Sequence, residues 1–215
     1  VTVNTIPEIK EGETSASLTV ETAKVAPNEK YYYSFTALED GRYTFSFETE
    51  SAYSFFTYKY WNNNINNGYD NYYDTKTFEI PVAKAQTVTF STSYAGMSDK
   101  DYTIKVEKIV PTALAEAGKD ESITIAPDSL KYISVTTDNT SEVTVRISPV
   151  ESEDGSLTSV NYEIYNNIQD KYYSTSGTAS SDNARTYTWT IPAGETRFVK
   201  LINTSSVEIK VNMKY

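Results

Sequence analysis

The chain has 215 residues, of which 39% are hydrophobic, and a formal net charge of −10. This length allows one large domain or two domains of about 100 residues each, and the hydrophobic content excludes a disordered chain. Because acidic residues are scattered and Lys/Arg clusters are absent, we expect neither a nucleic acid nor a membrane as partner.

The chain contains no His and no Cys. These absences exclude Ser-His and Cys-His catalysis, thiolate chemistry and the usual zinc sites, and we expect no cofactor. The sequence also has no apolar run of about 18 residues and no signal-peptide pattern. We therefore expect a soluble chain from which any targeting segment has been removed or in which it was never present.

Strand signals begin in the first third of the chain. Tyr43, Phe45 and Phe47 alternate with Thr44 and Ser46 after the turn signal Glu-Asp-Gly. An alternation of period two predicts a strand that is buried on one face.

The chain also repeats itself. The segment 26–47 matches 126–147 at an offset of 100 without a gap, and both begin with Ala-Pro. Three later matches follow in the same order: 58–63 with 162–167, 77–81 with 188–192, and 102–107 with 207–212. We interpret the repeat as two homologous domains, residues 1–109 and 113–215.

Helical periodicity is weak throughout. The best helical candidate is 111–121, which we interpret as the connector between the two domains. Short strands separated by turn signals instead predict an all-β fold, with two tandem antiparallel β-sandwich domains that are jelly-roll-like.

The order of the motifs resembles a known family. "YYYSFTALEDGRYTFSF" (31–47), a Tyr-rich strand, "TFEIP" (77–81) and a closing "YTIKV" (102–106) are similar to the bacterial pre-peptidase C-terminal domain pattern. That family resembles carbohydrate-binding modules, which implies a non-catalytic part of a secreted or cell-surface bacterial protein that contains other domains. The tandem, Tyr-rich and Cys-free layout also resembles the starch-adherence modules on surface proteins of gut anaerobes.

Strand parity separates core aromatic residues from surface aromatic residues. Trp61 lies on the strand face opposite Tyr58 and Tyr60, and its counterpart Tyr165 lies opposite Ile164. We expect both Trp61 and Tyr165 to point outward; the alternative is that each ring packs under its own loop. Trp189, by contrast, aligns with Phe78 and shares a face with Ile191, so we expect it in the core.

A Tyr doublet follows in each copy, in 70–74 and in 170–174. Because adjacent strand residues face opposite ways, we expect one Tyr of each pair to pack inward and the other to stand beside Trp61 or Tyr165. A structural alternative is a hairpin that is capped by the doublet.

The ring of a sugar presents C–H groups on its face and hydroxyls at its rim, which suit aromatic planes and amide or carboxylate groups. Outward rings beside Asn and Asp therefore predict a surface that binds polysaccharide, preferably an α-glucan such as starch. The candidate ligand-binding residues are Trp61, Asn62, Asn63, Asn66, Tyr69, Asp70, Tyr72, Tyr73, Tyr165, Asn166, Asn167, Asp170, Tyr172 and Tyr173.

Three other functions fit parts of the sequence. A glycosidase could use Asp70 and Asp74, but Ser174 replaces the second carboxylate in copy two. A calcium site in 62–74 lacks the spacing of an EF-hand loop. A structural spacer or protein-binding module is the main alternative, because Tyr, Asn, Ser and Gly also make good protein-binding loops.

Overall fold

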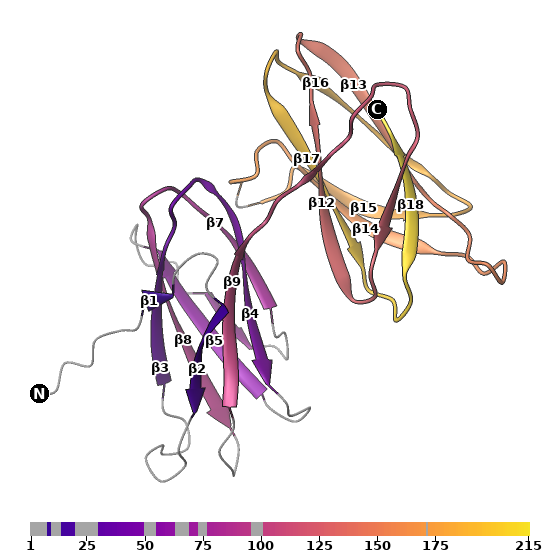
Figure 1. The fold of residues 1–215 in the computed structure, drawn as a ribbon. Coiled ribbons are helices and arrows are strands. Elements are labelled where there is room, and N and C mark those ends of the chain that lie inside the picture. Colours follow the sequence, from indigo (N-terminus) through magenta and orange to yellow (C-terminus); the bar gives the residue numbers. More distant parts are fainter. Residues whose placement is uncertain are drawn as a thin grey trace, which may run out of the picture. The chain divides into compact units, whose positions relative to one another are not determined.

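The computed structural model describes the backbone of residues 8–9, 14–19, 30–49, 55–62, 69–72, 77–95, 101–170 and 172–215. Side chains are described within 34–46, 79–89, 105–170 and 172–215. Every regular element in these ranges is a β-strand, so the predicted all-β class is confirmed (Figure 1). The chain divides into two compact units, Val1–Ile109 and Val110–Tyr215.

The first unit contains two sheets, of strand order β1-β3-β8-β5-β6 and β2-β9-β4-β7. Its strands are β1 Glu8–Ile9, β2 Thr14–Thr19, β3 Lys30–Thr36, β4 Gly41–Thr49, β5 Phe55–Asn62, β6 Tyr69–Tyr72, β7 Thr77–Val82, β8 Thr87–Ala95 and β9 Asp101–Lys108.

The second unit contains sheets of order β10-β12-β17-β14-β15 and β11-β18-β13-β16. Its strands are β10 Thr112–Ala113, β11 Glu121–Ile125, β12 Ser129–Thr136, β13 Ser141–Pro149, β14 Ser159–Tyr165, β15 Thr175–Ser180, β16 Arg185–Ile191, β17 Thr196–Asn203 and β18 Ile209–Lys214.

Both units have the same topology. In the second unit the chain changes sheet at every connection except the one between β14 and β15, and the first unit does so except between β5 and β6. Pairing is antiparallel apart from the short edge pairs β1–β3 and β10–β12. This alternation between two antiparallel sheets is the arrangement of a jelly-roll sandwich.

Segment 111–121, the best helical candidate in the sequence, contains no helix, and part of it belongs to the second unit. Thr112 and Ala113 form β10, which pairs with β12, and Leu114 is buried in the core of the second unit. The chain then turns at Gly118, whose φ of 79° lies in the left-handed region that glycine adopts without strain. Because Thr112 already pairs with Ile133, the second unit begins before residue 113.

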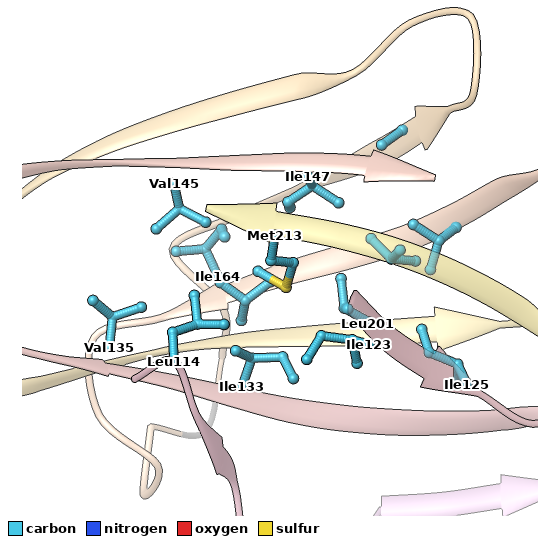
Figure 2. Close-up of a cluster of buried hydrophobic side chains, with 14 of the residues drawn as sticks. Leu114, Ile123, Ile125, Ile133, Val135, Val145, Ile147, Ile164, Leu201 and Met213 are labelled. Atoms are coloured by element: carbon cyan, nitrogen blue, oxygen red, sulfur yellow. The ribbon is translucent and has the colours of Figure 1, made fainter. Parts of the chain in front are cut away.

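Side chains from both sheets fill the core of the second unit (Figure 2). Ile133, Ile164 and Leu201 contribute from one sheet, while Val145 and Met213 contribute from the other. Strand β13 alternates buried and exposed residues from Val143 to Ile147. The period-two pattern therefore places apolar side chains between the two layers.

Trp189 belongs to this core, with 6% of its surface exposed, and its ring centroid lies 4.9 Å from that of Tyr187. The predicted burial of Trp189 and Ile191 is confirmed. In the first unit, Phe35 packs against Tyr43 and Phe45 at centroid distances of 5.0 and 5.6 Å.

The strand registers correct part of the predicted repeat alignment. Ala85 and Gly194 both have a positive φ, and their amides donate at 2.8 Å to the carbonyls of Ala37 and Thr137. Residue 85 therefore corresponds to 194, an offset of 109, whereas matching 77–81 with 188–192 requires an offset of 111. Trp189 takes the place of Ile80, not of Phe78.

The match between the closing strands is also shifted. Phe47 pairs with Ile104, and its counterpart Ile147 pairs with Met213, although the sequence match places Ile104 opposite residue 209. The first match is displaced by two residues and the second by four, and both displacements are even. A shift by two leaves a period-two pattern unchanged, so hydrophobicity alone does not reveal it.

Asn203, only 1% exposed, joins three segments at one end of the second unit. Its amide nitrogen donates to the carbonyls of Ile125, Ala126 and Val207 at 3.2, 3.0 and 2.8 Å. Its amide oxygen accepts from the backbone N–H of Ser205 at 2.9 Å. One side chain thus links the end of β11 to the turn between β17 and β18.

We expect Asn203→Ala to lower the free energy of unfolding of the second unit by about 2–4 kcal/mol, because buried polar groups that lose a partner cost about 1–3 kcal/mol each. The exposed Asn139→Ala is the control and should change it by less than about 0.5 kcal/mol. Urea unfolding followed by Trp189 fluorescence in a Trp61→Phe background measures both. Equal stabilities of the two variants would contradict the role given to Asn203.

Candidate functional site

The candidate site in the second unit lies at the end of β14, where the strand leaves the sheet. Val160 and Ile164 face the core, and Tyr162 is partly buried against it. Asn161, Glu163 and Tyr165 therefore lie on the outer face of the sheet, as the parity predicts.

Tyr165 is nevertheless buried, with 4% of its surface exposed, so the expectation of an exposed ring at this position is wrong. Its ring centroid lies 6.1 Å from that of Tyr132 and 6.4 Å from that of Tyr173, which stands perpendicular to it. Its hydroxyl donates to Glu163 Oε2 at 2.7 Å. The ring packs under its own loop, which is the alternative left open by the sequence.

Two further aromatic side chains on the outer face are buried as well. Tyr132 is 2% exposed and Phe198 is 9% exposed, and neither belongs to the cluster between the sheets. Phe198 stands opposite Tyr165 in the pairing of β14 with β17. We call Tyr132, Tyr165 and Phe198 the outer aromatic cluster.

An ion pair borders the outer aromatic cluster. Lys200 Nζ lies 3.6 Å from Glu163 Oε2 and 5.8 Å from the ring centroid of Tyr132. Glu163 thus accepts the Tyr165 hydroxyl and faces a cation at the same oxygen. These contacts hold Tyr165 in place and give it a structural role.

The loop after β14 uses its polar side chains to shape itself. Asn167 Oδ1 accepts from the backbone N–H of Gln169, and Asp170 Oδ2 accepts from the N–H of Asn167, both at 2.9 Å. Such bonds between a side chain and the nearby backbone define tight polar turns. Asn166 and Asn167 remain exposed at the surface.

Tyr172 and Tyr173 are the exposed aromatic residues of this region, with 67% and 49% of their surfaces exposed. They lie in the loop before β15, and Ser174 anchors that loop through its N–H to the carbonyl of Ile164 at 2.7 Å. The expectation that one Tyr of this doublet packs inward is wrong, because the doublet lies in a loop and not in a strand.

The two Tyr doublets are not equivalent. Lys59 pairs with Asp70 in the first unit, and its counterpart Glu163 pairs with Ser176 in the second. Asp70 therefore corresponds to Ser176, and Tyr72 corresponds to Thr178. The predicted match of 70–74 with 170–174 is wrong, whereas Trp61, opposite Thr89, does correspond to Tyr165, opposite Phe198.

A cleft of about 590 Å³ adjoins the outer aromatic cluster. It is lined by Asn166, Asn167, Ile168, Glu195, Thr196, Arg197 and Phe198. Arg197 Nη1 donates to Glu195 Oε2 at 2.8 Å and to the Asn166 carbonyl at 3.2 Å, which ties the two walls together.

The sequence analysis does not single out Glu195, Arg197 or Phe198. Glu195 and Arg197 flank the start of an ordinary strand, and Phe198 has Thr89 at the equivalent position. The signal that reveals them is the strand register, because Phe198 stands beside Tyr165 only when β14 and β17 are paired.

The candidate residues of the first unit are placed only in part. Trp61 and Asn62 lie in β5, and Tyr69, Asp70 and Tyr72 lie in β6. Their side chains, like residues Asn63, Asn66 and Tyr73 as a whole, lie outside the described residues. The calcium alternative in 62–74 falls mostly on the same part of the chain.

No membrane-spanning helix occurs in the ranges described above. Nor do three acidic side chains come together there as a metal site would require.

Comparison with known proteins does not place the chain in a family. No protein-family model matches it, and no curated protein matches it. Among solved structures it is similar to the CUB1-EGF-CUB2 domains of rat MASP-1, with 9% identity, a TM-score of 0.27, and coverage of 98% of this chain and 100% of that one. This likeness is too weak to support any statement about the site.

We expect Tyr165→Ala to destabilise the second unit by about 3–5 kcal/mol, because the loss of a buried aromatic ring leaves a cavity. Tyr165→Phe should cost about 1.5–3 kcal/mol through the lost bond to the Glu163 carboxylate. Tyr172→Ala, at an exposed position, is the matched control. Urea unfolding that gives the same midpoint for Tyr165→Ala and Tyr172→Ala would overturn the buried placement.

Proposed function

We propose that this chain is a non-catalytic module that binds polysaccharide, and that its second unit does so through Tyr172 and Tyr173. The observation that carries the proposal is the exposure of both rings in the segment that follows the exposed amides of Asn166 and Asn167, with Tyr173 in contact with Tyr165. Large exposed aromatic residues beside polar groups are typical of binding surfaces.

The chemistry of these residues suits a sugar chain. Tyr rings offer flat apolar faces for the C–H groups of a pyranose, while the amides of Asn166 and Asn167 can donate to and accept from hydroxyls. We assign the aromatic surface that contacts the sugar, the Tyr platform, to Tyr172 and Tyr173. Tyr165 is not part of it, because its ring is buried.

An α-glucan such as starch is the preferred ligand, on the resemblance to starch-adherence modules. An open surface supports only weak binding at one site, with a Kd on the order of 10 μM to 1 mM. Two sites on one chain raise the avidity by about 10² to 10⁴ if a single polysaccharide reaches both. Trp61 and its neighbours are the proposed binding site of the first unit.

The proposed module is non-catalytic, which is supported by two carboxylates near the platform that have structural partners. Asp170 accepts from the backbone of Asn167, and Glu195 is paired with Arg197. A glycosidase instead needs two carboxylates that can exchange protons with the substrate. Asp70 and Asp74, the pair that the sequence offers to a glycosidase, lie outside the described side chains. A secreted or cell-surface location in a bacterium, within a larger protein, completes the proposal.

We expect the full chain to be retained on insoluble starch, with cellulose and xylan as parallel tests. In a Trp61→Ala background, Tyr172→Ala and Tyr173→Ala should each weaken retention about tenfold, which corresponds to a loss of about 1.4 kcal/mol of binding free energy. Leu157→Ala is the matched control, because Leu157 is 64% exposed and lies beyond the other end of β14.

Absence of retention on all three polysaccharides at high protein concentration would contradict the proposal and favour a spacer or protein-binding module. Retention of a Trp61→Ala chain that survives both Tyr substitutions would contradict the site in the second unit. Trp61→Ala tests the first unit separately, and release of reducing sugar from bound starch would contradict the non-catalytic assignment.

A further inference from the structure

We infer that the cleft beside the outer aromatic cluster is a second sugar subsite, continuous with Tyr172 and Tyr173, and that the site takes an extended neutral chain. This inference rests on the proposed function and names the class of its ligand. It also assigns a binding role to residues 195–198, which the sequence does not indicate.

The size and lining of the cleft fit a sugar residue. Its volume of about 590 Å³ falls within the roughly 300–1,000 Å³ of sites that hold small molecules. Most of the lining is polar, and the apolar surface is the part of Ile168 and of the largely buried Phe198 that reaches the cleft. The polar groups suit the hydroxyls at the rim of a pyranose, and the small apolar area suits its C–H groups.

The cleft adjoins the Tyr platform through Tyr165. The ring of Tyr165 contacts Tyr173 on one side, while Phe198 stands opposite it in the sheet. Asn166, which lines the cleft, directly follows Tyr165 in the chain. A ligand that lies across Tyr173 therefore reaches the cleft by passing the end of β14.

Arg197 fixes the shape of the cleft and leaves it without net positive charge. Its guanidinium, with 14% of the side chain exposed, links Glu195 to the carbonyl of Asn166. The Glu195 carboxylate compensates the charge of Arg197 locally, and the chain as a whole carries −10. Among the residues that line the cleft, the cation is already paired, so a uronic acid polymer would gain no charge pairing there, whereas a neutral glycan needs none.

The test compares short and long oligosaccharides on the full chain. Maltose with maltoheptaose, and cellobiose with cellohexaose, are titrated into the Trp61→Ala variant, so that the second unit is observed. For whichever of the two oligosaccharide series binds, we expect the longer oligosaccharide to bind about tenfold tighter, or more, than the disaccharide. Its addition should also shift the NMR signals of the Arg197 and Phe198 amides, which the disaccharide leaves in place.

Thr196→Trp, at a position that lines the cleft but is not part of the Tyr platform, fills the cleft. It should weaken binding of the longer oligosaccharide about tenfold, while binding of the disaccharide on the Tyr platform stays unchanged. Asn183→Trp, in the exposed turn after β15, is the matched control. Arg197→Met should reduce the preference for the longer chain in the same way, because the walls of the cleft lose their link.

Equal affinity for short and long oligosaccharides would overturn the subsite, and so would a Thr196→Trp variant that binds like Asn183→Trp. Tighter binding of an oligogalacturonate than of any neutral oligosaccharide would overturn the neutral class. Retention of the chain on insoluble starch or cellulose does not depend on these outcomes. If the chain is retained, only the subsite has failed; if it is not retained, the proposed function has failed.

Discussion

The five-stranded sheet of the second unit buries side chains on both of its faces where β14 crosses β17. Ile164 and Val199 face the core, while Tyr165 and Phe198, with Tyr132 beside them, are covered on the outer face. Register fixes which side chains are neighbours on a face, so Tyr165 cannot be exposed unless this cluster is opened. Exposed rings in this region must therefore come from loops.

The loops that supply those rings are held by short polar contacts. Asn167 and Asp170 close the turn after β14, and Ser174 returns the chain to Ile164. Arg197 then links this turn to the start of β17. A loop constrained in this way loses less conformational freedom when a ligand binds, which favours affinity at a shallow surface.

Period-two patterns predict faces well and registers poorly. The pattern places Ile164 and Trp189 in the core and Tyr165 on the outer face, as the structure does. It mismatches 77–81 with 188–192, since a slip of two residues preserves every face. Nor does it reveal what covers Tyr165, because Tyr132 and Phe198 come from distant strands. Residues 195–198 become candidates only through that long-range pairing.

Asn203 has a consequence for producing the protein. Together with Thr204 and Ser205 it forms the acceptor sequence for N-linked glycans. A glycan would attach to the same nitrogen that donates to Ile125, Ala126 and Val207, at a position with 1% exposure. The folded second unit and a glycan on Asn203 therefore exclude each other. In a eukaryotic secretory pathway, folding of this unit would have to be completed before the transferase acts.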